Sequence, residues 1–380
     1  MVKTVSYTIK NLLCKFKICI SYVVYRIILY SINKKEIDKF DFDVAVVCMA
    51  SLGDFITFCS VAKELSANGK SIVLVCRANT GIDEFAELTG YFKNVIAIST
   101  KFRHRIFNIK KLESIKAQKV IVAPAERHIL SDIYALAISS KCRILPDTLQ
   151  ACSLVSLKKI IDKKIEKLIY VDAIYELRRY EQYLTKEFNL NQSLSIFQFS
   201  RNSNHVKKEY IVVFPAAGGS KSKQWPLDRF AYVLNNICKD NKYDVMICGT
   251  KNEYKIGEEL LNMLTVRAKN ICGKTDLSSL KELLSKSRLV LANDSGSAHF
   301  SIACGIPTIV ICGCWEYGRF YPNSRMPKNS IAAIAKKDSM NCIPCGLSKP
   351  NCVRNGAVPC VLNVSVNNIL ETVINWGLVK

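Results

Sequence analysis

Residues 288–307 read RLVLANDSGSAHFSIACGIP, a pattern that sets the class of fold. An apolar run over 288–292 leads into a tight turn of small and polar residues over 293–299, and a helix of small residues follows. A turn of this kind leaves the first amides of the helix unpaired, at the positive end of the helix dipole, which suits a phosphate or diphosphate. The alternative is that Asp294 or Ser295 only caps the helix.

The same alternation of short β-branched runs and helical stretches extends over most of the chain. Buried strands that alternate with helices indicate parallel sheets covered on both faces. Two such series predict an α/β protein with two Rossmann-like, doubly wound domains that face a cleft. The expected strands are 44–48, 72–76, 95–98, 120–122, 143–145 and 168–171 in the first series, and 211–214, 244–248, 289–292 and 308–312 in the second.

The length of 380 residues fits about two domains. A basic and apolar segment is expected over 1–40, and the first domain over 41–185. A polar stretch rich in Ser and Asn makes 186–208 the best linker candidate. The second domain then covers 209–380 and includes a cysteine-containing tail and a last helix.

The N-terminal segment is strongly basic. Residues 1–33 carry five basic side chains and no acidic one, interleaved with Leu, Ile, Val and Tyr. Lys17 and Arg26 leave apolar runs well below the ~18 residues that a spanning helix needs. We therefore expect a basic amphipathic helix that lies on an anionic membrane surface, and a helix packed on the protein itself is the alternative.

The whole chain is basic as well, with 54 Lys and Arg against 32 Asp and Glu and a net charge of +22. Such a charge predicts a polyanionic partner, which could be nucleic acid, anionic lipid or a phosphorylated glycan. The sequence contains neither an aromatic RNA-binding motif nor a recognition-helix pattern, so no nucleic-acid partner is expected.

Seventeen cysteines are present, and most sit singly among aliphatic residues, as expected for reduced core thiols in a cytoplasmic protein. Four others, Cys342, Cys345, Cys352 and Cys360, cluster near the C-terminus. A structural zinc site is one interpretation of this cluster, and a loop of packed thiols is the other, because a second tight C-x-x-C pair is missing.

The turn Ser51-Leu52-Gly53-Asp54 directly follows the first expected strand and precedes a helix. Ligands of open parallel sheets bind beyond the carboxyl ends of the strands, where this turn is expected to lie. Gly53 lets the backbone turn, and Asp54 could accept a proton from an acceptor hydroxyl. The alternative is that Asp54 is a plain helix cap.

Two further strand ends carry residues suited to a nucleotide. A Gly/Ser loop with Ser220 and Lys223 follows strand 211–214, and its amides and ammonium groups could hold phosphate. Trp225, at the end of this loop, is expected to be a packing residue. Glu253 follows strand 244–248 and could bind ribose hydroxyls, although a solvated first-turn glutamate is equally open.

Other nucleotide and metal motifs are missing from the sequence. Neither G-x-G-x-x-G nor G-x-x-x-x-G-K-[ST] occurs, which argues against a dinucleotide dehydrogenase and a P-loop NTPase. The D-x-D pair at 41–43 precedes its strand and so lies at the wrong end of the sheet. No metal is assigned, and no cofactor is expected.

Taken in order, the strand-end motifs resemble the heptosyltransferase family, glycosyltransferase family 9, which has the GT-B fold. SLGD at 51–54 looks like its acceptor-side element, and KQWP at 223–226 looks like its K-x-W-P phosphate element. DSGSAH at 294–299 is similar to its D-[ST]-G-x-x-H donor signature. The resemblance covers roughly residues 42–375. FPAA at 214–217 stands where the family commonly reads H-P-G-A.

The resemblance implies an inverting glycosyltransferase that uses ADP-heptose and needs no metal. In it Asp54 would be the general base, with Ser51 and Gly53 on the acceptor side. The donor-side residues would be Ser220, Lys223, Glu253, Asp294, Ser295, Gly296 and His299, of which Lys223 and the amides of Ser295 and Gly296 would hold the diphosphate and Glu253 the ribose.

A basic belt in the first domain fits an anionic, lipid-linked glycan acceptor at the cytoplasmic face of the membrane. Solvated surface charge is the alternative. We therefore expect a peripheral enzyme of lipopolysaccharide core or related glycan synthesis. The same fold with another nucleotide sugar, or a non-catalytic nucleotide-sugar binder, stays open. The belt consists of Lys101, Arg103, His104, Arg105, Lys110, Lys111, Lys116 and Lys119, and we assign Arg103 and Arg105 to the acceptor side.

Overall fold

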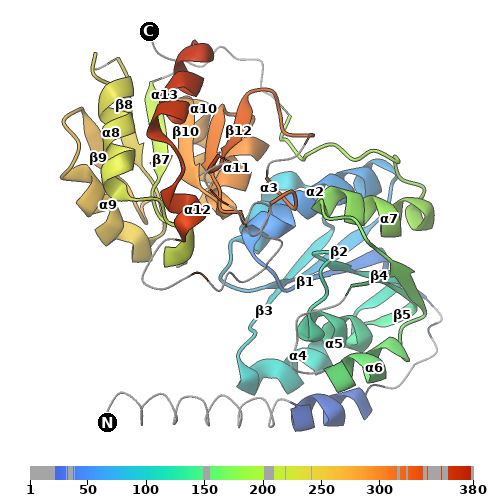
Figure 1. The fold of residues 1–380 in the computed structure, drawn as a ribbon. Helices are drawn as coiled ribbons and strands as arrows, with labels where there is room; N and C mark the ends of the chain where they lie inside the picture. The colour runs from blue at the N-terminus through green and yellow to red at the C-terminus, as the bar shows by residue number, and fades with distance from the viewer. Residues whose placement is uncertain are drawn as a thin grey trace, which may run out of the picture. The chain divides into compact units, whose positions relative to one another are not determined.

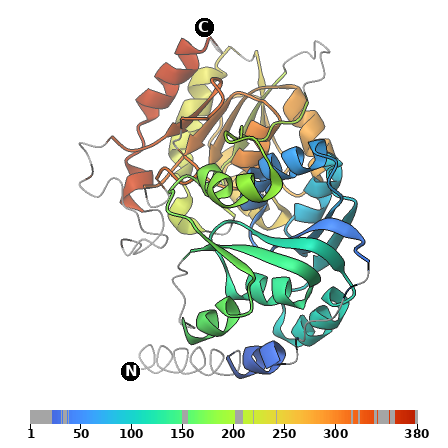
Figure 2. The same ribbon diagram turned by 90° about the vertical axis from the view of Figure 1, so that its right-hand side faces the viewer.

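The computed structural model divides the chain into two compact units (Figures 1 and 2). Unit 1 takes its described residues from Met1–Ala50, Val61–Asp172 and Arg179–Gln192, and unit 2 from Ser51–Ser60, Ala173–Arg178 and Ser193–Lys380. The turn after the first strand therefore belongs to unit 2. The structure describes residues 22–30, 32, 37, 39–148, 155–200, 209–218, 220–240, 242–314, 317–321, 324–336, 340, 352 and 358–377.

Unit 1 is built on a six-stranded parallel sheet with the order β3-β2-β1-β4-β5-β6. The chain starts in the centre and winds outward in both directions, as expected for a doubly wound sheet. Val44 to Cys48 are fully buried, because helices cover both faces of the central strand. The strands are β1 (Phe42–Cys48), β2 (Ile72–Arg77), β3 (Asn94–Ile98), β4 (Lys116–Ala123), β5 (Ser139–Asp147) and β6 (Lys167–Tyr170).

The helices of unit 1 lie on the two sides of this sheet, with α4, α5 and α6 together on one side in Figures 1 and 2. A helix over residues 22–30 packs outside them, and its Tyr25, Ile28 and Leu29 are buried in the same core cluster. The elements are α2 (Leu52–Ala67), α3 (Ile82–Thr89), η1 (Phe102–His104), α4 (Arg105–Leu112), α5 (Ile129–Ala137), α6 (Val155–Asp162) and α7 (Glu176–Phe188), of which α2 and α7 begin in unit 2.

Unit 2 repeats the plan with a six-stranded parallel sheet of order β12-β11-β10-β7-β8-β9. Its core is formed by the inner residues of these strands and by the apolar face of α8, which packs against α9 and α13. The strands are β7 (Tyr210–Phe214), β8 (Asp244–Ile247), β9 (Ala268–Asn270), β10 (Ser287–Asn293), β11 (Thr308–Ile311) and β12 (Ser330–Ala333).

The connections of unit 2 place three loops at the carboxyl ends of β7, β8 and β10, which are neighbours in the sheet. The α/β architecture with two parallel sheets, predicted from the sequence, is thereby confirmed. The helical elements are η2 (Lys221–Lys223), α8 (Leu227–Ile237), η3 (Lys251–Glu253), α9 (Tyr254–Leu261), α10 (Leu277–Ser285), α11 (Gly296–Ala303), α12 (Pro359–Leu362) and α13 (Val366–Asn375).

The N-terminal segment expected over 1–40 is described only in part, because residues 1–21 lie outside the described residues. Within the portion of the chain that the structure describes, no helix combines the length and the apolar character needed to cross a bilayer.

Candidate functional site

The turn at residues 51–54 positions Asp54 in the first turn of α2. The carboxylate oxygen Oδ2 of Asp54 accepts hydrogen bonds from the backbone N–H of Ser51 at 3.2 Å and from its hydroxyl at 2.6 Å. Asp54 is therefore not the residue that precedes the helix; it lies inside the helix and reaches back to that residue. This closed turn fixes the direction of the carboxylate.

Asp294 and Ser295 join β10 to α11, and His299 lies in the first turn of this helix; we call residues 295–299 the Ser295–His299 turn. Ser295 precedes the helix in an extended conformation, and no side-chain hydrogen bond from it caps the helix. Its hydroxyl instead donates to the carbonyl oxygen of Asn293 at 3.1 Å. Ser295 thus occupies the N-cap position without a side-chain cap, and the N-terminal amides of α11 keep the arrangement that suits an anion.

The two turns pack against each other within unit 2. A Cβ atom added to Gly53 would lie 2.7 Å from Cδ2 of His299, and one added to Gly296 would lie 3.4 Å from Cβ of Leu52. Only glycine fits at position 53 while the imidazole keeps its place. The structure thus brings Asp54 together with the Ser295–His299 turn, although more than two hundred residues separate them in the sequence.

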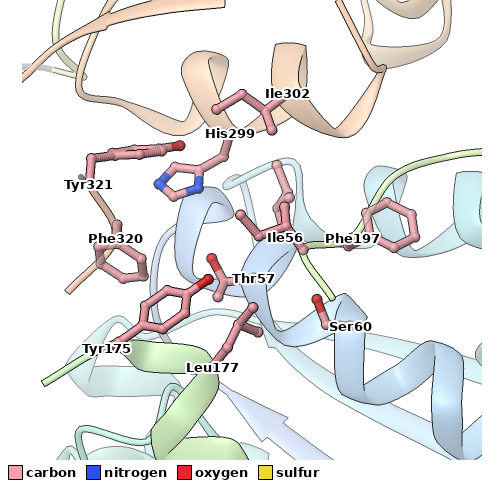
Figure 3. A pocket seen from close by; sticks show the side chains of 11 residues that line it. Ile56, Thr57, Ser60, Tyr175, Leu177, Phe197, His299, Ile302, Phe320 and Tyr321 are labelled. Atoms are coloured by element: carbon pink, nitrogen blue, oxygen red, sulfur yellow. The ribbon is translucent and has the colours of Figure 1, made fainter. Parts of the chain in front are cut away.

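His299 is surrounded by aromatic and aliphatic side chains (Figure 3). Its ring centroid lies 4.9 Å from that of Tyr321 and 5.2 Å from that of Phe320. Burial lowers the pKa of His299 to about 4, while Asp294 and Asp54 oppose this shift. The imidazole is therefore neutral near pH 7 and can donate one hydrogen bond.

A small cavity of about 30 Å³ lies beside His299, with room for about one water molecule (Figure 3). Ile56, Thr57 and Ser60 of α2 form one wall. The hydroxyls of Ser60 and Tyr321 are buried there without a hydrogen-bond partner among the described residues. Burial and the nearby Asp294 carboxylate raise the pKa of Tyr321, so its hydroxyl stays protonated.

Arg319 faces the Asp54 carboxylate, a contact that no sequence pattern predicted. Its Nη2 lies 3.6 Å from Oδ1 of Asp54, and its Nε donates to Oε2 of Glu176 at 3.2 Å. The backbone N–H of Glu176 donates in turn to the carbonyl oxygen of Arg319 at 3.0 Å. One guanidinium therefore lies between a fully buried carboxylate and one that is partly exposed, at 0% and 18% exposure.

Lys223 and Asp294 form an ion pair, with Nζ 2.8 Å from Oδ2. A buried amide next to them orders the loops: Nδ2 of Asn293 donates to the carbonyl oxygen of Pro215 at 2.7 Å, and its Oδ1 accepts from the backbone N–H of Trp225 at 3.0 Å. No sequence pattern indicated this role for Asn293, whose side chain connects the loop after β7 to the end of β10.

Trp225 itself is fully buried and packs edge-to-face on Phe230, with ring centroids 5.1 Å apart. Its predicted role as a packing residue is confirmed.

Glu253 and Ser220 occupy the neighbouring strand ends. Oε2 of Glu253 accepts from the backbone N–H of Thr250 at 2.7 Å and from its hydroxyl at 3.0 Å, which completes a capping box. The hydroxyl of Ser220 lies 2.7 Å from that of Ser222. Glu253 is thus a helix-start residue, as one of the two interpretations held, and it also stands at the carboxyl end of β8.

Arg103 and Arg105 belong to unit 1, whereas the other predicted site residues belong to unit 2. Nε of Arg103 donates to Nε2 of His104 at 3.1 Å. The guanidinium of Arg105 lies over the rings of Tyr25 and Phe102, 5.0 Å from each centroid. Arg103 lies in η1, and Arg105 is the first residue of α4.

The cysteine cluster is described only in part, since Cys342 and Cys345 lie outside the described residues. Cys360 is buried, its Sγ accepts from the backbone N–H of Cys314 at 3.3 Å, and hydrogen bonding from Cys314 lowers the pKa of Cys360 to about 6. Over the described ranges, no group of three or more potential metal ligands occurs.

Comparison with known proteins gives a consistent picture. The sequence profile of the family described as glycosyltransferase family 9 (heptosyltransferase) matches residues 110–343. The chain is 30% identical over 137 residues to the lipopolysaccharide core heptosyltransferase OpsX of Haemophilus influenzae, which is 36% of this chain and 38% of that protein. It is 28% identical over 142 residues to lipooligosaccharide heptosyltransferase 2 of Campylobacter jejuni, which is 36% of this chain and 42% of that protein. The aligned part thus spans about two fifths of these relatives.

Solved structures match over nearly the whole chain. The ADP-heptose lps heptosyltransferase II of E. coli superposes with a TM-score of 0.67 at 16% identity, over 88% of this chain and 98% of that one. The E. coli heptosyltransferase WaaC with ADP-2-deoxy-2-fluoro heptose gives 0.65 at 14% identity, over 88% and 99%. At these identities the likeness concerns the fold, and the expected GT-B fold is confirmed.

Proposed function

Because this chain belongs to glycosyltransferase family 9, we propose that it transfers heptose from ADP-heptose to a lipopolysaccharide core or a related surface glycan, with inversion at the anomeric carbon. The observation that supports this best is the packing of the Asp54 turn against the Ser295–His299 turn inside unit 2. It places a carboxylate beside the helix start that suits a diphosphate.

On the acceptor side, we assign Asp54 as the general base. The acceptor oxygen attacks the anomeric carbon of the donor as its proton passes to Asp54, while the bond from that carbon to the diphosphate oxygen breaks and the nucleotide leaves. Ser51 directs the carboxylate through its two hydrogen bonds, and Arg319 does so through the ion pair. Gly53 lets Asp54 approach the His299 turn.

On the donor side, the negative charge that develops on the leaving diphosphate needs preorganised donors. We assign the amides of Ser295 and Gly296, the Lys223 ammonium and the neutral His299 imidazole to this task. Asp294 holds the ammonium in place at 2.8 Å. Ser220 belongs to the same loop as Lys223. Glu253 would accept a hydrogen bond from a ribose hydroxyl through Oε1, the oxygen that is not engaged in its capping box.

The acceptor in this proposal is an anionic, lipid-linked glycan bound from unit 1, with Arg103 and Arg105 as its anion contacts. The enzyme then works from the inner face of the cytoplasmic membrane, as a peripheral protein. The reaction as proposed needs no metal or other cofactor, in line with what the family resemblance implies. The names of the solved relatives support the donor, because one of them holds an ADP-heptose analogue.

The test is nucleotide release measured with ADP-heptose in parallel with UDP- and GDP-sugars, in the presence of a lipopolysaccharide core acceptor. We expect nucleotide release with ADP-heptose and none with the UDP- or GDP-sugars. Asp54→Asn should lower transfer by about 10²- to 10⁴-fold, as is usual for loss of a general base, while calorimetry still detects donor binding. Nucleotide release with a UDP- or GDP-sugar would favour an enzyme of the same fold that uses another nucleotide sugar. Donor binding without transfer by the native chain would favour a non-catalytic nucleotide-sugar binder.

A further inference from the structure

Two short segments of unit 1 expose large apolar side chains. The helix over 22–30 exposes Val23 at 54%, Ile27 at 62% and Tyr30 at 72%. The segment formed by η1 and α4 exposes Phe102 at 44%, Ile106 at 61% and Phe107 at 71%. We call these six residues the apolar patch. Side chains of this size singly exposed need no explanation, but two adjoining groups of three do.

The two segments adjoin each other through Arg105. Its guanidinium lies 5.0 Å from the ring centroid of Tyr25 and 5.0 Å from that of Phe102. Behind the patch, Ile28 and Leu29 of the first segment and Ile109 of the second are buried in one core cluster. Each helix therefore has a buried apolar face that stabilises unit 1 and, in addition, apolar residues turned to solvent.

The side chains that border the patch are mainly basic. Lys101, Arg103, Lys110 and Lys111 are exposed on the same segment, and neither 22–30 nor 99–112 contains an acidic residue. Beyond the helix, Ile32 lines a cavity of about 380 Å³ together with Lys163 and Lys164 of the turn after α6. The nearest acidic residues are Glu113, which directly follows α4, and Glu166, which lines the cavity and pairs with Arg143 at 3.1 Å. Partners with anionic groups are attracted to such a surface because its exposed charges are mainly basic.

Apolar and aromatic side chains bordered by lysine and arginine are the composition of interfacial membrane-binding surfaces. A protein partner would need complementary acidic and apolar groups in fixed positions, whereas an anionic bilayer offers both over any area. We propose that the apolar patch inserts into the headgroup region of an anionic lipid bilayer, while the surrounding basic side chains contact lipid phosphates. This inference rests on the proposed function in one respect, because a lipid-linked acceptor explains why the enzyme would need such a surface.

Vesicle binding tests the inference without donor, acceptor or catalysis, so its outcome is separate from that of the transfer assay. The full chain is sedimented with vesicles of phosphatidylcholine that contain phosphatidylglycerol, and with vesicles of phosphatidylcholine alone. We expect binding to the anionic vesicles, weakened by salt, and loss of about tenfold or more in partitioning for the variant Ile106→Ser/Phe107→Ser, since two large side chains no longer leave water.

The matched control is Tyr232→Ser/Ile374→Ser, which removes two similarly exposed side chains, at 55% and 58%, from unit 2. It should bind like the native chain. Equal binding of the native chain and the Ile106→Ser/Phe107→Ser variant would overturn the inference, because the membrane would then be bound elsewhere, for example by residues 1–21.

A second variant guards against misfolding of the first. Phe107→Trp keeps an aromatic side chain, and its emission should shift to the blue on anionic vesicles and be quenched by brominated lipid, relative to the three native tryptophans. An unchanged spectrum would contradict insertion. Light scattering measures the molar mass of the native chain and of the Ile106→Ser/Phe107→Ser variant. A native dimer that becomes a monomer in this variant would overturn the inference, because a second copy and not a bilayer would then cover the apolar patch.

Discussion

Unit 1 and unit 2 each contain an arginine that contacts two carboxylates, and the two groups differ in burial. In unit 1, Arg127 is 1% exposed and bonds Asp132, which is 3% exposed, at 2.9 Å, and Asp162 at 2.8 Å. In unit 2, Arg319 is 15% exposed and lies 3.2 Å from Glu176 and 3.6 Å from Asp54, which is 18% exposed. Each group leaves one carboxylate partly exposed, Asp162 at 22% and Asp54 at 18%. We call the first group closed because both of its carboxylates accept hydrogen bonds from the arginine, and the second open because Asp54 does not.

The difference separates a structural from a proposed catalytic use of the same residue types. Both carboxylates in contact with Arg127 accept hydrogen bonds from it, and Asp162 accepts a further one from Lys158 at 2.7 Å. Asp54 is held more loosely, at a distance that is an ion pair but not a hydrogen bond. A carboxylate of this kind is held in direction but not fully engaged by the arginine.

Breaking the closed group should have the largest effect on stability. Asp132→Ala leaves Arg127 buried with only one partner, and we expect the free energy of unfolding to fall by about 3 to 5 kcal/mol. Chemical denaturation measures this. Lys286→Ala, which removes an exposed pair with Glu282 at 3.0 Å, should leave the free energy of unfolding nearly unchanged. Similar losses for the two variants would show that burial does not distinguish these groups.

Breaking the open group should act on catalysis. Arg319→Met leaves Asp54 without its ion pair, and we expect kcat for transfer to fall by about a hundredfold with little change in KM for the donor. Arg319→Lys, which restores the charge, should recover part of the loss. A variant that raises only the KM for the donor would place Arg319 in nucleotide binding rather than in the direction of Asp54.

The close contact of the two turns can be tested by crowding it. Gly53→Ala introduces a methyl group 2.7 Å from the His299 ring, and we expect the free energy of unfolding to fall by about 2 kcal/mol, together with the transfer rate. His299→Ala should relieve the stability loss in the double variant Gly53→Ala/His299→Ala, because the ring is then gone. If the double variant loses as much stability as Gly53→Ala and His299→Ala lose together, the turns are not in contact in solution.

The last prediction concerns pH. The folded pKa of His299 is about 4, below the ordinary value of 6.5 for histidine, so the unfolded chain binds a proton more readily than the folded one. Stability from this group is present above pH 6.5 and is lost as the pH falls toward 4. Denaturation at pH 7 and pH 4.5 should show a smaller acid loss in His299→Gln than in the native chain.

The sequence predicted the fold well, because the buried strands of a parallel α/β sheet appear in the sequence as short apolar runs. Asp54, Asp294 and His299 were also within reach, since each lies in a turn directly after such a run. Arg319 and Glu176 were not, because their roles come from contacts between segments more than a hundred residues apart. The amide of Asn293 was missed for the same reason: nothing near it in the sequence shows that Pro215 and Trp225 are its partners.

The roles assigned to the site residues remain predictions, and so do the domain boundaries drawn from the sequence. Sequence patterns could not show that Ser51–Ser60 groups with unit 2, because that grouping depends on contacts such as that of Gly53 with His299.

Unit 2 is assembled from three separate stretches of chain, and this limits how the protein can be divided. A fragment that starts at Ser193 would keep Arg319 and the helix start at α11 but lack both Asp54 and Glu176. In a chimaera that joins the first 192 residues of one family member to the remainder of another, the 51–60 segment comes from one parent. The histidine that it packs against comes from the other parent. Recombination between relatives should therefore succeed only where that turn and its histidine travel together.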